Sequence, residues 1–223
     1  LIKFNIKLIS SGGTYKEIKK LGFVCEKISN YTDTPEILDG RVKTLHPKIH
    51  AGILSKRKKN SHIKDLKKNS FKEIDLVIVN FYPFEKNLET SKNHEKIIEN
   101  IDVGGPTMVR AAAKNYNDVT VITSPQQYKN LIKELNKFNG KTSLRFRQEM
   151  SENAFGETAY YDSVIANWLN LEAKIKFIAK NSKLVLPEPF ELEFLFSKTH
   201  LSFWRFDDDK FVIQKTSLIF FTT

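Results

Sequence analysis

One segment of the sequence places two cations close together in a pattern that suits an anion. In residues 40–47 (GRVKTLHP), Arg41 and Lys43 alternate, so an extended backbone would project both side chains to one side. The Arg guanidinium is a planar fork for phosphate, whereas the Lys ammonium is a compact charge suited to a developing oxyanion. Thr44 adds a hydroxyl group. A solvated basic loop would show the same pattern, so these cations need partners elsewhere in the chain.

A second candidate is the glycine-containing loop Ser10-Ser11-Gly12-Gly13-Thr14. It follows a strand-like run and opens a helix-like one. Glycines allow close approach of the backbone, and the free N–H groups and positive dipole of a helix start favour an anion. This pattern predicts a phosphate contact. The alternative is a tight turn in which Thr14 caps the helix.

An acid and a lysine belong to a third candidate, residues 101–114 (IDVGGPTMVRAAAK). Gly-Gly-Pro fits a helix start with Pro in the first turn, where its missing N–H costs nothing. Thr107, Arg110 and Lys114 share one face of this helix, and Asp102 precedes it. An acid and a lysine near one pocket could divide the general-base and general-acid roles. The alternative is a surface salt-bridge pattern.

The fourth candidate ends the most strand-like run, residues 75–80 (DLVIVN). Asn80 and Tyr82 come at its carboxyl end, where ligands bind in open α/β sheets. We therefore expect both side chains to reach a ligand. Phe81 and Phe84, which flank Tyr82, are expected in the core.

The surrounding elements that must position these residues alternate between strand and helix. We predict short β-branched strands at residues 5–10, 22–28, 75–80 and 118–123. We predict helices at residues 14–21, 94–100, 106–115, 125–138 and 144–180. This alternation indicates an α/β protein with a parallel sheet.

Two helical segments carry a prediction about exposure. The charge run at residues 56–68 is expected to be a solvated loop and helix. In the last helix, the packed face is predicted to contain Phe155, Ala159, Ile165 and Leu169.

The composition narrows the class of protein. Of 223 residues, 40% are hydrophobic and 28% charged, which is typical of a globular protein and not of a disordered or fibrous one. Lys and Arg total 36 against 26 Asp and Glu, which gives a net charge of +10. The basic residues are scattered and match no nucleic-acid-binding motif. The basic balance therefore suits either a small phosphorylated ligand or merely a lysine-rich surface, and no nucleic acid is expected.

Membrane, secreted and metal-binding classes are not expected. No apolar run approaches the roughly 20 residues needed to span a bilayer, and the first residues lack the apolar core of a signal peptide. The single cysteine, Cys25, fits a reducing cytoplasm and a buried apolar position. The five histidines show no metal-ligand spacing, so no metal is predicted.

Five runs occur in a fixed order along the chain: SSGGT, TPEILDGRVKTLHPKIHAGIL, DLVIVNFYPF, ENIDVGGPTMVRAAAKN and AFGETAYYDSVIANWL. Together they resemble the N-terminal domain of the bifunctional purine biosynthesis protein family. That family combines inosine monophosphate (IMP) cyclohydrolase with aminoimidazole-carboxamide ribonucleotide (AICAR) formyltransferase. The resemblance covers about residues 1–172.

The resemblance implies a methylglyoxal-synthase-like α/β fold, a parallel sheet sandwiched between helices, at residues 1–180. It implies closure of the formylated ribonucleotide (FAICAR) to IMP with loss of water, with no cofactor for this step. It also implies a cytoplasmic protein and a homodimer in the intact parent. Residues 181–223 would be a linker and an atypical tail where the formyltransferase domain, which uses 10-formyltetrahydrofolate, would begin.

The resemblance also assigns residues by motif position. Phosphate would be held by Ser11, Gly12, Gly13, Thr14, Arg41 and Thr44. The nucleotide site would be lined by Lys43, Val79, Asn80, Asp102, Val103 and Gly104. The catalytic set would be Lys114, Asp102, Lys43 and Tyr82, with Tyr82 near the reacting formyl group. Asp102 would accept a proton from the attacking amine, and Lys114 would supply one to the departing hydroxyl.

The sequence departs from the family at both ends. The family's opening strand and Ser-Asp-Lys loop are absent, which predicts an N-terminally truncated sheet and an incomplete phosphate site. The linker run LPEPFELEFLF is kept, but the sequence from about Ser197 onward does not match the formyltransferase domain. Two alternatives to a cyclohydrolase therefore stay open: a nucleotide-sensing module of the same fold, and an inactive gene fragment.

Overall fold

The computed structural model describes residues 1–81, 84–91, 93–172, 195–197, 200–207 and 210–214 of the chain. It divides the chain into two compact units, Leu1–Ser163 and Val164–Thr223. The boundary predicted between residues 180 and 181 lies outside the described residues. The second unit contains an antiparallel sheet of β5 (Leu195–Ser197), β6 (His200–Asp207) and β7 (Lys210–Gln214), in that order.

All four predicted strands are present in the first unit, each shorter than expected. They are β1 (Ile9–Ser10), β2 (Glu26–Lys27), β3 (Leu76–Ile78) and β4 (Thr120–Ile122). β1 pairs with β2 and β3 pairs with β4, both in parallel. The α/β class with parallel strands is therefore confirmed, and the described strands form two separate pairs instead of one continuous sheet.

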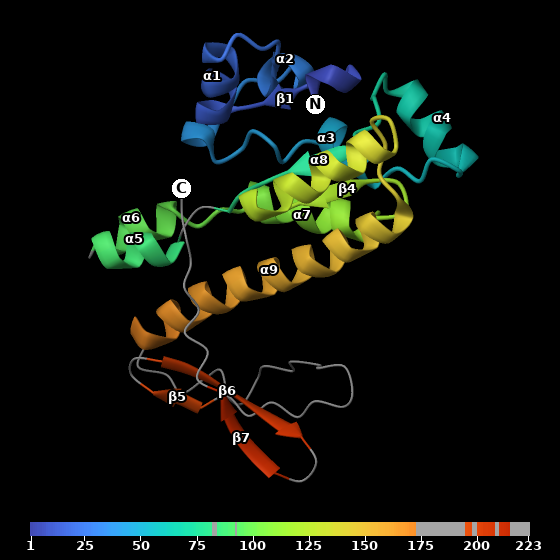
Figure 1. Ribbon diagram of the computed structural model, residues 1–223. Helices are drawn as coiled ribbons and strands as arrows, with labels where there is room; N and C mark the ends of the chain where they lie inside the picture. The colour runs from blue at the N-terminus through green and yellow to red at the C-terminus, as the bar shows by residue number, and fades with distance from the viewer. Residues whose placement is uncertain (82–83, 92, 173–194, 198–199, 208–209, 215–223) are drawn as a thin grey trace. The chain divides into compact units, whose positions relative to one another are not determined.

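The helices of the first unit follow the strands as expected (Figure 1). The predicted ones are α1 (Gly12–Lys20), α4 (Asn60–Lys68), α6 (His94–Glu99), α7 (Gly104–Lys114), α8 (Tyr128–Lys137) and the long α9 (Leu144–Glu172). Three helices were not predicted: α2 (Ile28–Thr32), α3 (Pro47–Leu54) and α5 (Phe84–Thr90). Two of these have fewer than eight residues, which is too short for the apolar period of a helix to show.

The core forms where α3 and α7 pack on the β3–β4 pair. Val109, Ala112, Val119, Val121 and Ile122 are fully buried. The small side chains of α7 let neighbouring elements approach closely, and α9 contacts it directly because the Ser151 hydroxyl donates to the Ala113 carbonyl (2.8 Å).

The predicted packed face of α9 is wrong by one residue at three of its four positions. Phe155 and Leu169 are 41% and 42% exposed, Ala159 is also exposed, and Ile165 is half-buried. The buried positions of this helix within the first unit are Phe146, Met150, Ser151, Ala154, Thr158 and Tyr161. Thr158 can be buried because its hydroxyl donates to the Ala154 carbonyl (3.1 Å), which satisfies a polar group inside the core.

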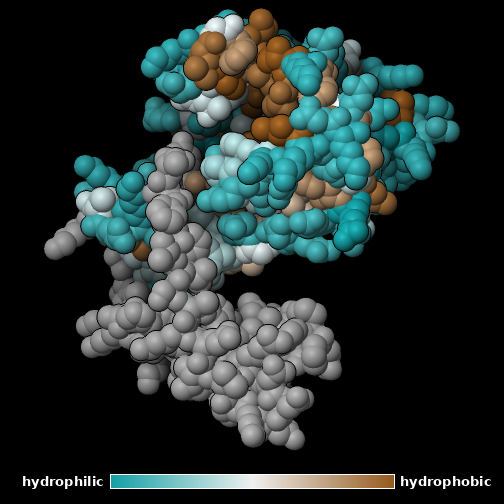
Figure 2. All heavy atoms as spheres, in the orientation of Figure 1, coloured by the Kyte–Doolittle hydropathy of each residue, from teal (hydrophilic) through white to brown (hydrophobic). Residues whose placement is uncertain are grey.

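The surface agrees with the charge pattern. The run at residues 56–68 forms a loop and α4, in which Leu66 is buried and the lysines are exposed, so the prediction of a solvated segment is confirmed. Figure 2 shows hydrophilic residues over most of the coloured surface and an apolar area over the N-terminal elements. The exposed apolar side chains of the chain between α1 and β2 are Leu21, Phe23 and Val24.

Gly52 of α3 gives a test of this packing. A Cβ atom at Gly52 would lie 2.5 Å from the Lys72 carbonyl oxygen and 3.1 Å from the Ile74 side chain. Because the obstacle is backbone, we expect Gly52→Ala to lower the free energy of unfolding by about 1–3 kcal/mol. Chemical denaturation measures this change.

Gly156 of α9 is the matched control. No atom lies within 4 Å of a Cβ built there, and the residue is inside a helix. Gly156→Ala is expected to stabilise the protein by about 0.5–1 kcal/mol, since alanine is the better helix former. Equal destabilisation by both substitutions would contradict the close approach at Gly52.

Candidate active site

Two of the predicted motifs lie side by side. A Cβ atom at Gly104 would overlap the Thr44 hydroxyl oxygen, so the Thr44 side chain occupies the space that any other residue type would fill. A second contact joins the same two segments. Arg41, three residues before Thr44, donates from Nε (3.1 Å) and Nη2 to the carboxylate of Glu99, five residues before Gly104. The segment carrying Arg41 and Thr44 therefore runs alongside the segment that leads into α7.

The ion pair with Glu99 uses only part of the hydrogen-bonding capacity of the Arg41 guanidinium. Both side chains are more than half exposed, so the ion pair contributes little to stability. Glu99 raises the pKa of Arg41, through a hydrogen bond and its charge. A guanidinium has five N–H donors, and the pair uses one edge of the group, so further donors stay available to an anion.

Lys43 sits on a tight turn. Ile37 and Val42 form an isolated antiparallel bridge, and between them Leu38 and Asp39 adopt positive φ angles. The Lys43 ammonium folds back over Gly40, 4.0 Å from the position of a Cβ there. This turn makes Lys43 half-buried while Arg41 is exposed.

Two histidines, His46 at the N-cap of α3 and His50 within α3, contact the chain around Thr44. The His46 Nδ1 accepts from the Lys48 backbone N–H (3.1 Å) and caps α3, so the ring proton belongs on Nε2, which faces the Thr34 hydroxyl (3.3 Å). His50, one turn later, interacts with the Thr44 backbone. Both rings therefore support the chain beneath Lys43 and Thr44.

Asp102 is fixed at the start of α7 by both its backbone and its side chain. Its Oδ1 accepts from the Gly105 backbone N–H (2.9 Å), and its own N–H donates to the Tyr161 hydroxyl (2.8 Å). A Cβ at Gly105 would overlap the Asp102 carboxylate and lie 3.1 Å from Val79 Cγ1. The free N–H groups of the helix start favour a negative charge at this position.

The carboxyl end of β3 meets this helix start, because Val79 Cγ1 lies 3.1 Å from the position of a Cβ on Gly105. Val79 continues the pairing with β4 through its N–H, which donates to the Ile122 carbonyl (3.0 Å). The exposed Asn80 amide donates to the Tyr128 hydroxyl (3.0 Å). Tyr82, predicted near the reacting group, lies outside the described residues.

The glycine loop has the predicted geometry, with the helix starting two residues earlier than expected. Ser11 is the N-cap of α1 in place of Thr14, and Gly12 has a φ of 53°. No atom lies within 4 Å of a Cβ at Gly12 or Gly13, so this helix start is open to a ligand. Among the described residues, no hydrogen bond or ion pair joins the loop to the Arg41 or Asp102 segments.

Lys114 is separated from Asp102 by the length of α7. The helix has eleven residues, so its two ends are about 15 Å apart at 1.5 Å per residue. Lys114 is exposed on the same face as Thr107 and Arg110, as the spacing predicted. Within one chain, therefore, the acid and the lysine do not share a pocket.

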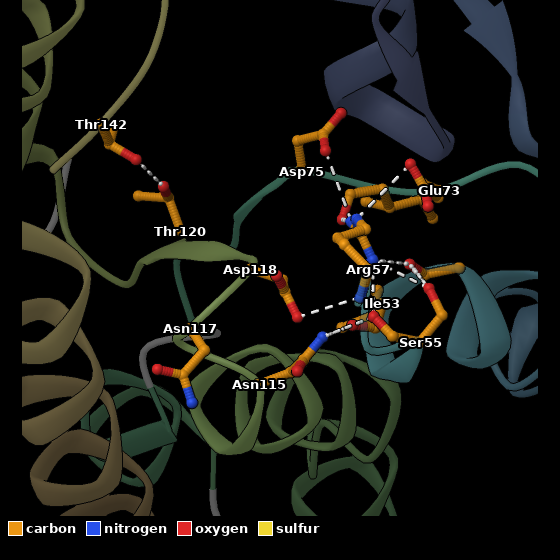
Figure 3. A network of polar contacts seen from close by, with 12 residues as sticks. Ile53, Ser55, Arg57, Glu73, Asp75, Asn115, Asn117, Asp118, Thr120 and Thr142 are labelled. Atoms are coloured by element: carbon orange, nitrogen blue, oxygen red, sulfur yellow. Dashed lines mark hydrogen bonds and ion pairs between the residues drawn. The ribbon is translucent and has the colours of Figure 1, made fainter. Parts of the chain in front are cut away.

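A polar network ties the far ends of α3 and α7 together (Figure 3). The Asn115 amide donates to the carbonyls of Ile53 (2.8 Å) and Ser55 (3.0 Å). The Arg57 guanidinium donates to the Ser55 and Ile74 carbonyls, and the Arg57 backbone N–H donates to the Asp118 carboxylate (3.2 Å). These bonds fix the two helices side by side, which brings Thr44 and Gly104 together at the other end.

Sequence reasoning missed the partners of the site residues. Glu99, His50 and Tyr161 each contact a predicted residue, and none of them was singled out. Tyr161 had a usable signal, because it continues the spacing of Phe146, Met150 and Ala154 along one face of α9. The ion pair of Glu99 had none, since it joins residues 58 positions apart.

Comparison with known proteins supports the resemblance. A family model described as an MGS-like domain matches residues 1–107, and one described as the AICARFT/IMPCHase bienzyme matches residues 112–194. A solved structure, "Crystal structure of ForH", is 30% identical with a TM-score of 0.66, and the match covers 74% of this chain and 85% of that one. The chain belongs to the family of the bifunctional purine biosynthesis protein. Both matched regions of this family contain candidate residues, Lys114 and Tyr161 among those of the second.

Curated relatives in this family are more similar in sequence. The bifunctional purine biosynthesis protein PurH of Prochlorococcus marinus (strain MIT 9515) is 47% identical over 174 residues, which is 78% of this chain and 33% of the relative. PurH of strain NATL2A is 48% identical over 183 residues, or 82% and 35%. PurH of Jannaschia sp. (strain CCS1) is 45% identical, over 77% and 33%. The chain thus spans about a third of the length of these relatives.

The part of the chain that the structure describes has no helix long and apolar enough to cross a membrane. The same described residues contain no group of three or more His, Cys, Asp or Glu side chains arranged to hold a metal ion.

His50 gives a testable pH dependence at this site. Burial lowers the pKa of His50 from its usual value of 6.5, and the Thr44 backbone opposes this effect. Its shielded Nε2 has no hydrogen-bond partner among the described residues. The unfolded chain therefore binds the proton more readily than the folded one.

Because the folded pKa is depressed, this contribution is fully present above about pH 6.5 and is lost as the pH falls towards the folded value, with a slope of at most about 1.4 kcal/mol per pH unit. Chemical denaturation between pH 5 and 8 measures the dependence. His50→Gln should flatten it. An unchanged slope in that variant would contradict the assignment.

Proposed function

We propose that this chain carries the IMP cyclohydrolase activity of purine biosynthesis, closing FAICAR to IMP with loss of water. The observation that carries this proposal is the meeting of the Arg41–Lys43–Thr44 segment with Asp102 at the start of α7. Cations, a hydroxyl and a fixed carboxylate beside the end of a β-strand suit a nucleotide monophosphate. The match to the family model described as the AICARFT/IMPCHase bienzyme supports the same conclusion, and the PurH relatives are named for purine biosynthesis.

The reaction makes one C–N bond and removes one water. The carboxamide nitrogen attacks the formyl carbon, and negative charge develops on the formyl oxygen. One proton leaves the carboxamide nitrogen and one leaves the formamide nitrogen, while the formyl oxygen gains two and departs as water. Asp102 is suited to accept the first proton, because the Gly105 N–H holds its carboxylate in a fixed position. Lys43 is suited to stabilise the oxyanion.

The remaining residues would bind the nucleotide. We propose that Ser11, Gly12, Gly13 and Thr14, at the open start of α1, hold the phosphate with Arg41 and Thr44. Val79, Asn80, Val103 and Gly104, around the end of β3 and the start of α7, would line the rest of the site, with Tyr82 near the formyl group. These assignments require no metal and no organic cofactor. The formyltransferase step and its 10-formyltetrahydrofolate would belong to another part of the parent protein.

The role of Lys114 requires a second copy of the chain. It lies about 15 Å along α7 from the start of the helix, so the Lys114 of the same chain does not reach a group beside Asp102. In the homodimer expected for the intact parent, the lysine of the second copy would supply the proton to the departing hydroxyl. The exposed face that carries Lys114 is available for this contact.

Turnover of FAICAR, followed by the ultraviolet absorbance of IMP, tests the activity. The wild-type chain should form IMP, and Asp102→Asn and Lys43→Ala should each lower kcat about 10²–10⁴-fold, since each removes a group that acts on the transition state. Lys64→Ala in α4, an exposed lysine of the charge run, is the control and should leave kcat unchanged.

Other outcomes favour the alternatives. Binding of IMP without turnover would favour a nucleotide-sensing module, and neither binding nor turnover would favour an inactive fragment. Normal turnover by the Asp102→Asn variant would overturn the proposed base.

Mixing two inactive variants tests the role of Lys114. Lys114→Ala and Asp102→Asn chains should each be inactive alone. Refolded together, half of the dimers would be mixed, and each mixed dimer would have one site with both residues intact, so about a quarter of the wild-type activity should return. If mixed dimers form and no activity returns, Lys114 does not act across the dimer.

A further inference from the structure

Tyr161 of α9 joins two segments of the candidate site. Its hydroxyl accepts from the Asp102 N–H at 2.8 Å. Its ring lies 5.2 Å from the Phe81 ring and 6.3 Å from the Phe84 ring, measured between centroids. The side chain is only 6% exposed. One buried residue thus contacts both the chain that follows β3 and the chain that precedes α7.

The ring and the hydroxyl of Tyr161 have different roles. The ring fills space between Phe81 and Phe84, which a phenylalanine would also fill. The hydroxyl satisfies a backbone N–H just before α7, a position where the helix itself offers no partner. Burial raises the pKa of Tyr161, the hydrogen bond from the Asp102 backbone opposes this effect, and the charges of Asp102 and Asp162 act with burial. The group therefore stays neutral, and its oxygen accepts the bond through a lone pair.

Asp102 is held from two sides as a result. Tyr161 fixes its backbone, and the Gly105 N–H fixes its carboxylate at 2.9 Å. These two bonds set both the position of the residue and the direction of its side chain. Without the Tyr161 hydroxyl, the Asp102 carboxylate would keep its bond from the Gly105 N–H. The Asp102 backbone N–H would lose its acceptor.

We propose that Tyr161 is a positioning residue for Asp102, acting through its hydroxyl and not through its ring. This inference rests on the proposed function, in which Asp102 is the base. A base works only when it is held close to the productive geometry, and loss of an outer hydrogen bond reduces turnover more than substrate binding.

The adjacent tyrosine is a matched control. Tyr160 is also in α9, and its hydroxyl donates to Glu85 of α5 at 2.8 Å. Tyr161→Phe and Tyr160→Phe each remove one hydroxyl from neighbouring positions of the same helix. Only the first touches Asp102.

The experiment measures kcat and KM for FAICAR in the full chain. Tyr161→Phe should lower kcat about 10-fold with KM within about 2-fold of wild type, and Tyr160→Phe should leave both unchanged. In the Asp102→Asn background, Tyr161→Phe should have no further effect, because the group it positions is gone. A general loss of packing would lower turnover in both backgrounds and for both tyrosines, which would overturn the proposal.

Hydrogen exchange of the Asp102 amide gives a readout that does not need turnover. The amide should be protected in the wild-type chain and should exchange about 10-fold or more faster in Tyr161→Phe. Rapid exchange in the wild type, or no change in the variant, would overturn the hydrogen bond itself.

The two proposals fail in different ways. If Asp102→Asn keeps normal turnover, or the wild type has none, the proposed function fails and the exchange measurement still decides the hydrogen bond. If Asp102→Asn is inactive and Tyr161→Phe matches the wild type in kcat, the positioning role alone fails.

Discussion

The candidate site depends on one close approach, that of Thr44 to Gly104. The Thr44 hydroxyl occupies the place of a side chain on Gly104, so any larger residue at position 104 would force the Thr44 side chain to move. Their helices, α3 and α7, are held together at the opposite end by the bonds from Asn115 to Ile53 and Ser55. The motif that supplies the cations and the motif that supplies the acid therefore reach the same place through two packed helices. Val79, at the end of β3, packs against Gly105 at the same helix start.

The net charge of +10 has a more limited role than its size suggests. Most of the lysines in the run at residues 56–68 face solvent, where a charge contributes little to any one contact. Arg57 is different, because its side chain is 18% exposed and serves the network between α3 and β3. Arg41 and Lys43 belong to the segment whose Thr44 meets Gly104 at the start of α7. The overall charge alone does not single them out, and their place beside this helix start comes from the packing.

The sequence predicted the elements well and their contacts poorly. The strands, the α7 start with Pro106 in its first turn, and the exposed Lys114 face follow from local patterns, which depend on a few neighbouring residues. The packed face of α9 was missed by one residue, because Phe155 is apolar and fits the period yet lies outside, with the Arg110 guanidinium 5.6 Å from its ring. Arg41 and Glu99 form an ion pair although they are 58 positions apart, and no local sequence pattern predicts such a contact. The distance from Asp102 to Lys114, by contrast, was readable from the helix length.

That distance shapes how a cyclohydrolase could work on this fold. The carboxylate of Asp102 is bonded to the start of α7, which holds it in place as the proton acceptor of the proposed reaction. A reaction that must then protonate a departing hydroxyl needs a separate donor, and Lys114 of the same helix is at the wrong end. A two-fold axis that set two α7 helices antiparallel would bring the lysine end of each towards the acid end of the other. Val103, Thr107, Arg110 and Lys114 lie along the face of α7 that such an axis would use, and Val103 is 57% exposed. A helix with its acid at one end and its lysine at the other is suited to a site shared between two chains, and unsuited to one built within a single chain.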